Sequence, residues 1–398
     1  VKIDTVGRTI YFGAYGQEKG ACPYYARVNK ARIDGNGQVE VLTPEQATHE
    51  AYFSKSGRYF VDNYSRADLE PRSVLRDNKG KVILELASPD LTRLYETGWK
   101  MPEPFTVKAA DGHTDLYGFM WKPFDFDSTR RYPIISYVYP GPQTEAIPLE
   151  FSVTAAYNVG LAQVGFVVVT FGHRGGSPMR DKWYHTFGYN NLRDYPLADD
   201  KCGIEQLADR FSFIDKSKVG IFGHSGGGFM STAALCTYPD FYTAAVSSAG
   251  NHDNNIYSQF FVESHYAIDE EVKVIEEKLE TKDGRDSVIM REKTFYSVNL
   301  PTNMELAKNL KGHLMLIVGG MDGNVHPVQT IRMVDAFINH GKDVEFVLLP
   351  RGRHTYDGVS AWYFENKLRS HFAKYLLGDF KSSGFYDIEI NEYEQIIK

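Results

Sequence analysis

The chain has 398 residues, 42% of them hydrophobic, and a net charge of −7 at pH 7. This composition is that of a globular protein, and the length allows two or three domains. The mild negative charge gives no reason to expect nucleic acid or a membrane surface as a partner, and no apolar run approaches the roughly 18 residues of a spanning helix. The sequence starts at Val1 without a signal-like segment, so we expect a processed or truncated start.

Residues 1–95 are rich in short strand-like runs separated by turns that contain glycine and asparagine. Such spacing is typical of the four-stranded blades of a β-propeller, of which about two fit in this length. Propellers close with roughly four to eight blades. Either the segment is a small β-module packed on the next domain, or the chain is the C-terminal part of a longer protein. We favour the second alternative, because a partial propeller exposes an unpaired edge. The expected strands are Thr9–Tyr15, Tyr24–Ile33, Val39–Leu42, Glu50–Phe53, Tyr59–Tyr64, Ser73–Arg76 and Val82–Leu86.

From about residue 96 the pattern changes to alternating strands and helices. Several of the strands are apolar on both faces, as in a parallel sheet that is covered on two sides. The sequence therefore predicts an α/β fold over residues 96–398, with a doubly wound, mostly parallel sheet. The expected strands are 105–107, 116–121, 132–139, 165–170, 219–222, 243–248, 313–318 and 344–349, and the expected helices are 151–165, 195–210, 229–236, 327–340 and 358–377.

The segment Gly223-His224-Ser225-Gly226-Gly227 lies between the strand 219–222 and the helix 229–236. It fits the G-x-S-x-G pattern, in which a serine occupies a sharp strand-to-helix turn and glycines avoid collisions with neighbouring backbone. The turn exposes the serine hydroxyl at the end of the sheet and places the Gly226 N–H at a helix start, where an oxyanion can bind. The alternative is a glycine-rich loop with an unreactive serine. The strand before the turn and the helix after it favour a nucleophile.

A serine nucleophile needs a base to accept its proton and an acid to orient that base. In α/β-hydrolases the three residues occur in the order Ser, Asp or Glu, His. Asp322 follows the strand 313–318, and His354 follows the strand 344–349. Because ligands bind at the C-terminal ends of strands in such sheets, we expect Ser225, Asp322 and His354 to meet there. The other histidines after Asp322 fall in or beside expected helices: His326, His340 and His371.

The remaining histidines and cysteines give no sign of a metal site. Cys22, Cys202 and Cys236 are far apart and odd in number, so we expect small buried side chains rather than disulfides or metal ligands. The sequence has no H-E-x-x-H motif, and we expect neither a metal nor a cofactor. We expect the ring nitrogens of His224 to be satisfied by backbone groups beside the turn, and His326 to lie near a helix start.

These motifs resemble the prolyl oligopeptidase family of serine peptidases, most closely its dipeptidyl peptidase IV branch. The resemblance covers most of residues 96–380. It implies an α/β-hydrolase fold capped by a β-propeller, with residues 1–95 as a remnant of the last blades. The matching pieces are Tyr137-Val138-Tyr139-Pro140-Gly141-Pro142, Arg174-Gly175-Gly176-Ser177, the Ser225 turn, Asp322-Gly323-Asn324-Val325-His326 and Arg353-His354.

The resemblance also implies roles for individual residues. The Tyr139 hydroxyl and the Gly226 N–H would share the oxyanion hole. Asn324 would help to hold a backbone carbonyl of the substrate. Tyr257 belongs to an aromatic run within 251–266, a region that in the family lines the pocket for the residue before the scissile bond.

The sequence departs from the family pattern at three places. Gly226 stands where the dipeptidyl peptidase IV branch has a tyrosine, and Thr355 where glycine is usual. The interval between the strands 243–248 and 313–318 is long, and we expect its charged run, Asp269–Lys282, to be the solvated face of a helix. Residues 1–95 also lack a convincing match to the two acidic residues that bind the peptide amine in dipeptidyl peptidases.

We therefore expect a serine peptidase that acts on short peptides, releases N-terminal dipeptides and prefers Pro or Ala before the cut. A carboxylesterase on the same fold is the first alternative. Tyr139-Pro140-Gly141-Pro142, in place of an HGGG-type motif, argues against it. A non-catalytic interaction module is the second alternative. Family analogy alone favours a homodimer and an extracytoplasmic or periplasmic location.

Overall fold

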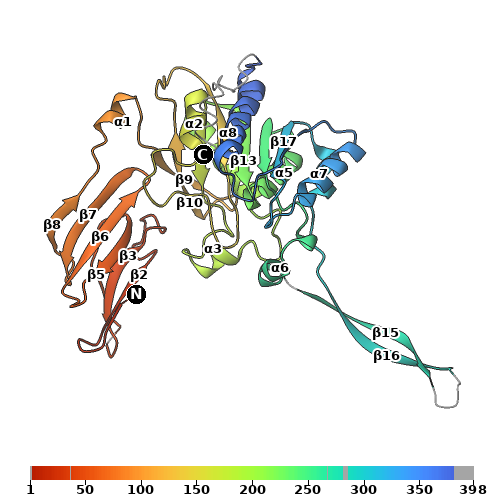
Figure 1. The fold of residues 1–398 in the computed structure, drawn as a ribbon, viewed down its shortest axis with the longest axis horizontal. Coiled ribbons are helices and arrows are strands. Elements are labelled where there is room, and N and C mark those ends of the chain that lie inside the picture. The colour runs from red at the N-terminus through yellow and green to blue at the C-terminus, as the bar shows by residue number, and fades with distance from the viewer. Residues whose placement is uncertain (1, 36, 267, 281–285, 381–398) are drawn as a thin grey trace.

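The computed structural model describes residues 2–380, except 36, 267 and 281–285 (Figure 1). Within these residues the strands form two four-stranded sheets near the N-terminus, one eight-stranded sheet and one two-stranded hairpin. Figure 1 shows the two small sheets at one end, the large sheet with its helices in the middle, and the hairpin projecting from the other end.

The N-terminal part consists of two antiparallel meanders, ordered β1-β2-β3-β4 and β5-β6-β7-β8. Along β6 buried residues alternate with more exposed ones, as in a strand with one face on a core. The two meanders match the two blade-like units that the turn spacing predicted. The strands are β1 Lys2–Asp4, β2 Thr9–Ala14, β3 Arg27–Arg32, β4 Val39–Val41, β5 Thr48–Phe53, β6 Tyr59–Arg66, β7 Leu69–Asp77 and β8 Val82–Ala87.

The eight-stranded sheet has the order β18-β17-β14-β13-β11-β12-β10-β9. The strands from β18 to β12 run parallel, and β10 and β9 form an antiparallel edge. All five residues of β12 and of β14 are buried, which confirms that these strands are covered on both faces. The strands are β9 Glu103–Lys108, β10 Asp115–Trp121, β11 Tyr132–Tyr137, β12 Val167–Phe171, β13 Ile214–His224, β14 Ala244–Ser248, β17 His313–Gly319 and β18 Glu345–Leu349.

Helices cover both faces of this sheet, and successive strand residues point to opposite layers. Ile134 belongs to the apolar cluster formed with α4, α5 and α7, whereas Ile135 belongs to the cluster formed with α2 and α8. The sheet is therefore doubly wound, as predicted. The helices are α1 Thr92–Glu96, α2 Asn158–Val164, α3 Lys182–Thr186, α4 Leu197–Arg210, α5 Gly226–Thr237, α6 Gln259–His265, α7 Val328–Asn339 and α8 Gly358–Phe372, with the 3₁₀ turns η1 Asn254–Ile256 and η2 Met304–Asn309 and the π-helical turn η3 Ala373–Leu377.

Two sequence predictions of helix are corrected by the structure. The run Asp269–Lys282 is not a helix, because β15 (Asp269–Glu280) pairs along its length with β16 (Asp286–Ser297), while Lys282 lies outside the described residues. The helix expected over 151–165 begins only at Asn158. Ala155 and Ala156 have φ values of +44° and +54°, and this left-handed backbone cannot continue into an α-helix.

Segments of both small sheets share buried side chains or hydrogen bonds with the part of the chain that forms the large sheet. Tyr24 and Ala67 belong to the apolar cluster on the α2 and α8 face of the large sheet. The Tyr24 hydroxyl lies 3.2 Å from that of Tyr184, which donates a hydrogen bond to Glu145 over 2.5 Å. Thr48 on β5 donates a hydrogen bond to the Leu149 carbonyl over 2.8 Å. Both Glu145 and Leu149 belong to the loop that follows Tyr139, so this loop is held from the N-terminal side.

The cysteines form no disulfide. Cys236 is buried as expected, but Cys22 and Cys202 are only half-buried, so the expectation of three buried side chains is wrong for two of them. Among the described residues, none of the helices has the length and apolar character needed to cross a membrane.

Candidate active site

Ser225 occupies the sharp turn between β13 and α5. Its φ of 57° and ψ of −120° lie in a region that L-residues seldom adopt, so the surrounding contacts must hold the turn in place. The Ser225 N–H donates to the Ser248 carbonyl over 2.8 Å, and the Ser225 carbonyl accepts from the Phe229 N–H over 3.0 Å. Because α5 begins at Gly226, the Gly226 N–H has no acceptor within the helix.

Two glycines let this turn lie directly against the end of β11. A Cβ on Gly223 would lie 2.3 Å from the Val138 oxygen, and one on Gly227 would lie 2.1 Å from the same oxygen. Such distances are far below van der Waals contact, which confirms the reason given for glycine at both positions of the motif. The close packing also places the next residue, Tyr139, beside the serine turn.

Hydrogen bonds join the three candidate residues at the C-terminal ends of their strands. The Ser225 hydroxyl lies 3.1 Å from His354 Nε2, in position to donate to it. His354 Nδ1 lies 2.8 Å from Asp322 Oδ2, and the other carboxylate oxygen, Oδ1, accepts the N–H groups of Asn324 and Val325, each over 2.9 Å. The Asp322 side chain is fully buried, while that of His354 is 22% exposed. This geometry fits nucleophilic attack assisted by a base with a fixed tautomer.

A second histidine, His224, packs against the ring of His354. The ring of His224 lies 4.8 Å from that of His354 and 5.4 Å from that of Tyr356. His224 Nδ1 lies 2.9 Å from the Ser248 hydroxyl, which donates to the Tyr356 hydroxyl over 3.0 Å. The expectation that backbone groups alone satisfy the ring is therefore wrong, because the turn brings the side chain of Ser248 within reach of Nδ1. Burial, followed by the proximity of His354, lowers the pKa of His224 to about 4, so the ring stays neutral at neutral pH.

The free energy of unfolding is expected to fall as the pH drops from 6.5 toward 4. Burial is the main cause that lowers the pKa of His224 to about 4, and burial lowers that of His252 to about 3, from 6.5. Across this window the unfolded chain binds protons that the folded chain excludes, so stability rises with pH and is lost as pH falls. The loss is on the order of 2 kcal/mol for each histidine by about pH 4.5. Urea denaturation at that pH and at about pH 7.5 measures it.

A matched pair of variants separates this effect from the titration of carboxylates. His224→Asn keeps a polar group near the position of Nδ1 but takes up no proton, so its stability should differ less between the two pH values. His113 lies in an exposed turn, and His113→Asn should behave like the unchanged protein. An equal pH difference in all three proteins would contradict the role given to His224.

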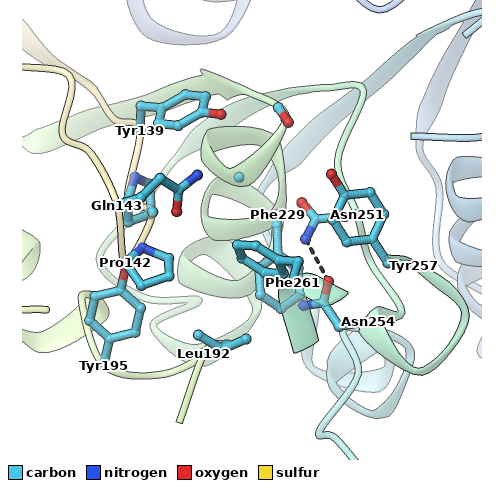
Figure 2. Close-up of a pocket in the computed structure, with 14 residues that line it drawn as sticks. Tyr139, Pro142, Gln143, Leu192, Tyr195, Phe229, Asn251, Asn254, Tyr257 and Phe261 are labelled. Carbon is cyan, nitrogen blue, oxygen red and sulfur yellow. Dashed lines mark hydrogen bonds between the residues drawn. The ribbon is translucent and has the colours of Figure 1, made fainter. Parts of the chain in front are cut away.

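A cavity of about 70 Å³ opens beside Ser225 (Figure 2). The loop Tyr139–Gln143 forms one wall, and residues of the segment 251–261 form the opposite wall. In Figure 2 the Tyr139 hydroxyl points across the cavity toward the side of Asn251 and Tyr257. The lining residues are Tyr139, Pro140, Gly141, Pro142, Gln143, Leu192, Tyr195, Ser225, Gly226, Phe229, Asn251, Asn254, Tyr257 and Phe261.

Of the two candidate substrate-binding residues, Tyr257 lines this cavity, whereas Asn324 does not line it but contacts Tyr257. The Tyr257 hydroxyl donates to Asn324 Oδ1 over 3.2 Å, so this pair connects the cavity to the Asp322 loop. His326 lies just before α7, and its Nδ1 accepts the Val328 N–H over 3.2 Å, in agreement with the expected place near a helix start.

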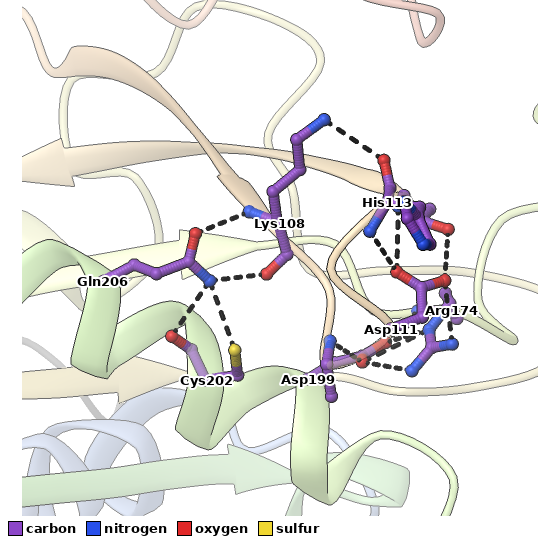
Figure 3. Close-up of polar contacts among 9 residues, drawn as sticks. Lys108, Asp111, His113, Arg174, Asp199, Cys202 and Gln206 are labelled. Carbon is purple, nitrogen blue, oxygen red and sulfur yellow. Dashed lines mark hydrogen bonds and ion pairs between the residues drawn. The ribbon is translucent and has the colours of Figure 1, made fainter.

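The loop after β12 packs against Tyr195, one of the residues that line the cavity. Arg174 pairs with the fully buried Asp199 on α4 through contacts of 2.7 to 3.2 Å, and with Asp111 over 3.0 Å (Figure 3). The next residue, Gly175, lies against the ring of Tyr195, where a Cβ would approach ring carbons to 2.6 Å. The motif that contains Arg174 therefore fixes the ring of a cavity-lining residue.

Several lining residues were not singled out from the sequence. Gln143 directly follows Tyr139-Pro140-Gly141-Pro142, so its adjacency to that motif was an available signal. Leu192 and Tyr195 reach the cavity from the loop before α4, some thirty residues ahead of Ser225, and only the three-dimensional path of the chain reveals them. Within the described residues, no three His, Cys, Asp or Glu side chains are placed to hold a metal ion.

Two family models match the sequence, and a solved structure resembles the fold. A family model described as the prolyl oligopeptidase family matches residues 151–381, and one for the N-terminal region of dipeptidyl peptidase IV matches residues 1–71. The structure resembles that of Porphyromonas gingivalis dipeptidyl peptidase 4 with a TM-score of 0.75 at 20% identity, over 94% of this chain and 49% of the other.

Curated relatives carry related names. Human dipeptidyl peptidase 8 is 25% identical over 89% of this chain and 38% of its own length. Dipeptidyl peptidase 4 of Trichophyton tonsurans is 26% identical over 86% of this chain and 41% of its own length. The chain therefore spans less than half the length of these relatives.

Proposed function

Because this chain belongs to the prolyl oligopeptidase family of serine peptidases, we propose that it hydrolyses short peptides and releases N-terminal dipeptides. The observation that carries this proposal is the hydrogen-bonded series Ser225–His354–Asp322 at one end of the sheet. The names of the relatives support the dipeptidyl specificity. The preference for Pro or Ala stays a prediction.

In the proposed mechanism Ser225 Oγ attacks the carbonyl carbon of the scissile bond while its proton passes to His354 Nε2. The Asp322 carboxylate stabilises the imidazolium that forms. The oxyanion accepts hydrogen bonds from the Gly226 N–H and the Tyr139 hydroxyl. When the C–N bond breaks, His354 gives the proton to the leaving amine. A water molecule then hydrolyses the acyl-enzyme by the same route and regenerates Ser225.

Asn324 and Tyr257 are proposed to orient the peptide. Asn324 Oδ1 is engaged by the Tyr257 hydroxyl, and this contact fixes the orientation of the Asn324 amide. The amide N–H groups of Asn324 can then donate to a backbone carbonyl of the substrate. Holding the peptide backbone in this way restricts the reacting carbonyl to the neighbourhood of Ser225.

Replacing Tyr139 with phenylalanine is expected to lower kcat by about 100- to 1000-fold, the usual cost of one lost oxyanion donor. KM should change little, because the donor acts mainly in the transition state. Steady-state kinetics on a dipeptide p-nitroanilide measure both constants. Tyr59→Phe, on the exposed surface of β6, is the matched control. A kcat for Tyr139→Phe within threefold of the control would remove the hydroxyl from the mechanism.

The carboxylesterase alternative is tested by comparing turnover of dipeptide p-nitroanilides with that of p-nitrophenyl acetate. The proposal requires cleavage of the anilides, and preferred cleavage of those with a free amine over their acetylated forms supports dipeptide release. Turnover of the ester alone would favour an esterase. Absence of Ser225 labelling by a fluorophosphonate probe would favour a non-catalytic module. By family analogy we also propose a homodimer, which light scattering can test.

A further inference from the structure

The cavity beside Ser225 is the natural place for the side chain before the scissile bond. The reacting carbonyl carbon must approach Ser225 Oγ while its oxygen faces the Gly226 N–H. The Cα of that residue is one bond away, so its side chain enters the space next to both groups. That space is the cavity lined by Ser225, Gly226 and Tyr139. The chemistry of its far wall therefore decides which residue precedes the cut.

Asn251 presents an unused hydrogen-bond acceptor at this wall. It is only 6% exposed. Its Nδ2 donates to Asn254 Oδ1 over 2.6 Å, whereas its Oδ1 has no hydrogen-bond partner within the described residues. In Figure 2 the Nδ2 of Asn251 is turned toward Asn254, and its oxygen is directed toward the side of Gln143. The contact with Asn254 thus fixes which end of the amide faces the cavity.

The backbone that carries these two asparagines is firmly held. Asp253, which lies between them, is paired with Arg332 on α7 over 2.6 Å, and its N–H donates to the Gln329 side chain over 2.8 Å. Asn255 exchanges two hydrogen bonds with the backbone of Leu300. These contacts hold the backbone that directly follows Asn251.

Tyr195 adds a second unused polar group at the same cavity. Its side chain is 4% exposed, and its hydroxyl has no hydrogen-bond partner among the described residues. The ring is fixed between two backbone segments, since a Cβ on Gly175 or on Gly188 would approach it to 2.6 Å or 2.9 Å. A hydroxyl can donate or accept, so it can pair with either kind of polar group.

The cavity has neither the charge nor the size for an ionic or a large side chain. None of the described residues that line it is charged, so a buried lysine, arginine or carboxylate of the substrate would lack a partner. Its volume of about 70 Å³ suits a few heavy atoms.

We propose that this pocket selects a small, neutral side chain with a hydroxyl or a carboxamide, namely Ser, Thr or Asn, before the scissile bond. This inference rests on the proposed peptidase function and names its substrate class. It competes with the expected preference for Pro or Ala, whose side chains would leave the unused oxygen of Asn251 unpaired, and the experiment below distinguishes the two. An unpaired buried group costs a factor of about 10 to 100, so kcat/KM should favour Ser, Thr and Asn over Ala and Pro by at least about tenfold.

The test measures kcat/KM for a set of Gly-X p-nitroanilides with X as Ser, Thr, Asn, Ala, Pro or Lys. In parallel, Gly-X diphenyl phosphonates with the same side chains report the rate at which Ser225 is phosphonylated. Faster reaction with Ser, Thr and Asn in both series supports the inference. Preference for Ala or Pro overturns the inference alone. No reaction with any member overturns the proposed function and the inference with it.

Two variants assign the preference to the named groups. Asn251→Leu should lower kcat/KM for the polar substrates at least tenfold and invert the preference toward Ala. Tyr195→Phe should reduce the preference without loss of stability, because the hydroxyl bonds to nothing in the folded chain. Asn339→Leu, on the exposed end of α7, is the matched control and should leave the preference unchanged. An unchanged preference in both Asn251→Leu and Tyr195→Phe would overturn the assignment.

Discussion

Replacing Ser225 with alanine is expected to lower the rate of peptide hydrolysis by about 10⁴- to 10⁶-fold while the protein stays folded. The loss is large because the hydroxyl is the group that forms the acyl-enzyme, and the remaining residues cannot supply another nucleophile. The residual rate should reflect the oxyanion donors and substrate binding alone. Active-site titration with a fluorophosphonate and steady-state kinetics on a dipeptide p-nitroanilide measure the effect.

Ser217 offers a control at the opposite end of the same strand. It is exposed, and Ser217→Ala should keep both labelling and turnover. The folded state of each variant can be verified by its thermal unfolding, because the strained turn at Ser225 does not depend on the hydroxyl for its hydrogen bonds. Hydrolysis by Ser225→Ala at more than a hundredth of the unchanged rate would show that another residue is the nucleophile.

Replacing Asp322 with asparagine is expected to lower kcat by about 10⁴-fold, with little change in shape. The two N–H groups of Asn324 and Val325 bind Asp322 Oδ1 and would hold the oxygen of an asparagine in that place. The new NH₂ group would then face His354 Nδ1 and donate to it. His354 would carry its own proton on Nε2, where it cannot accept the proton of Ser225.

This prediction is separable from a general loss of stability. Asp335 lies on the exposed side of α7, and Asp335→Asn should leave kcat unchanged. Fluorophosphonate labelling of Asp322→Asn should slow in parallel with kcat, since both reactions need the same proton transfer. A loss of only tenfold, with normal labelling, would contradict the proposed role of Asp322.

The strands of the large sheet were predictable because they are short, continuous runs of apolar residues, as expected for strands buried on both faces. In Val167–Phe171 all five residues are buried, and the short length, the β-branched side chains and the flanking glycines favour a strand over a buried helix. The turn at Ser225 was predictable from its glycines, since each one faces a carbonyl at a distance that excludes a Cβ. In both cases the local sequence is itself the constraint.

The hairpin and the start of α2 were not predictable in this way. The charged run Asp269–Glu280 alone is typical of a solvated helix. Its pairing as a strand depends on a second segment, Asp286–Ser297, and the first segment by itself does not predict that pairing. The late start of α2 depends on the left-handed backbone of Ala155 and Ala156. Alanine seldom adopts this conformation, so the sequence does not predict it. The walls of the cavity likewise combine segments that lie far apart in the sequence. The proposed domain boundary between residues 95 and 96 stays a prediction.

Tyr24, buried against the large sheet, has a consequence for how the molecule comes apart. Its hydroxyl, that of Tyr184 and the Glu145 carboxyl form a chain of contacts that water would have to invade before the N-terminal strands could detach. Since the same loop carries Tyr139, detachment would also disorganise the oxyanion donors. Heating should therefore unfold the N-terminal strands and the large sheet in one cooperative transition. Turnover should be lost in the same transition, without an intermediate in which the large sheet alone stays folded and active.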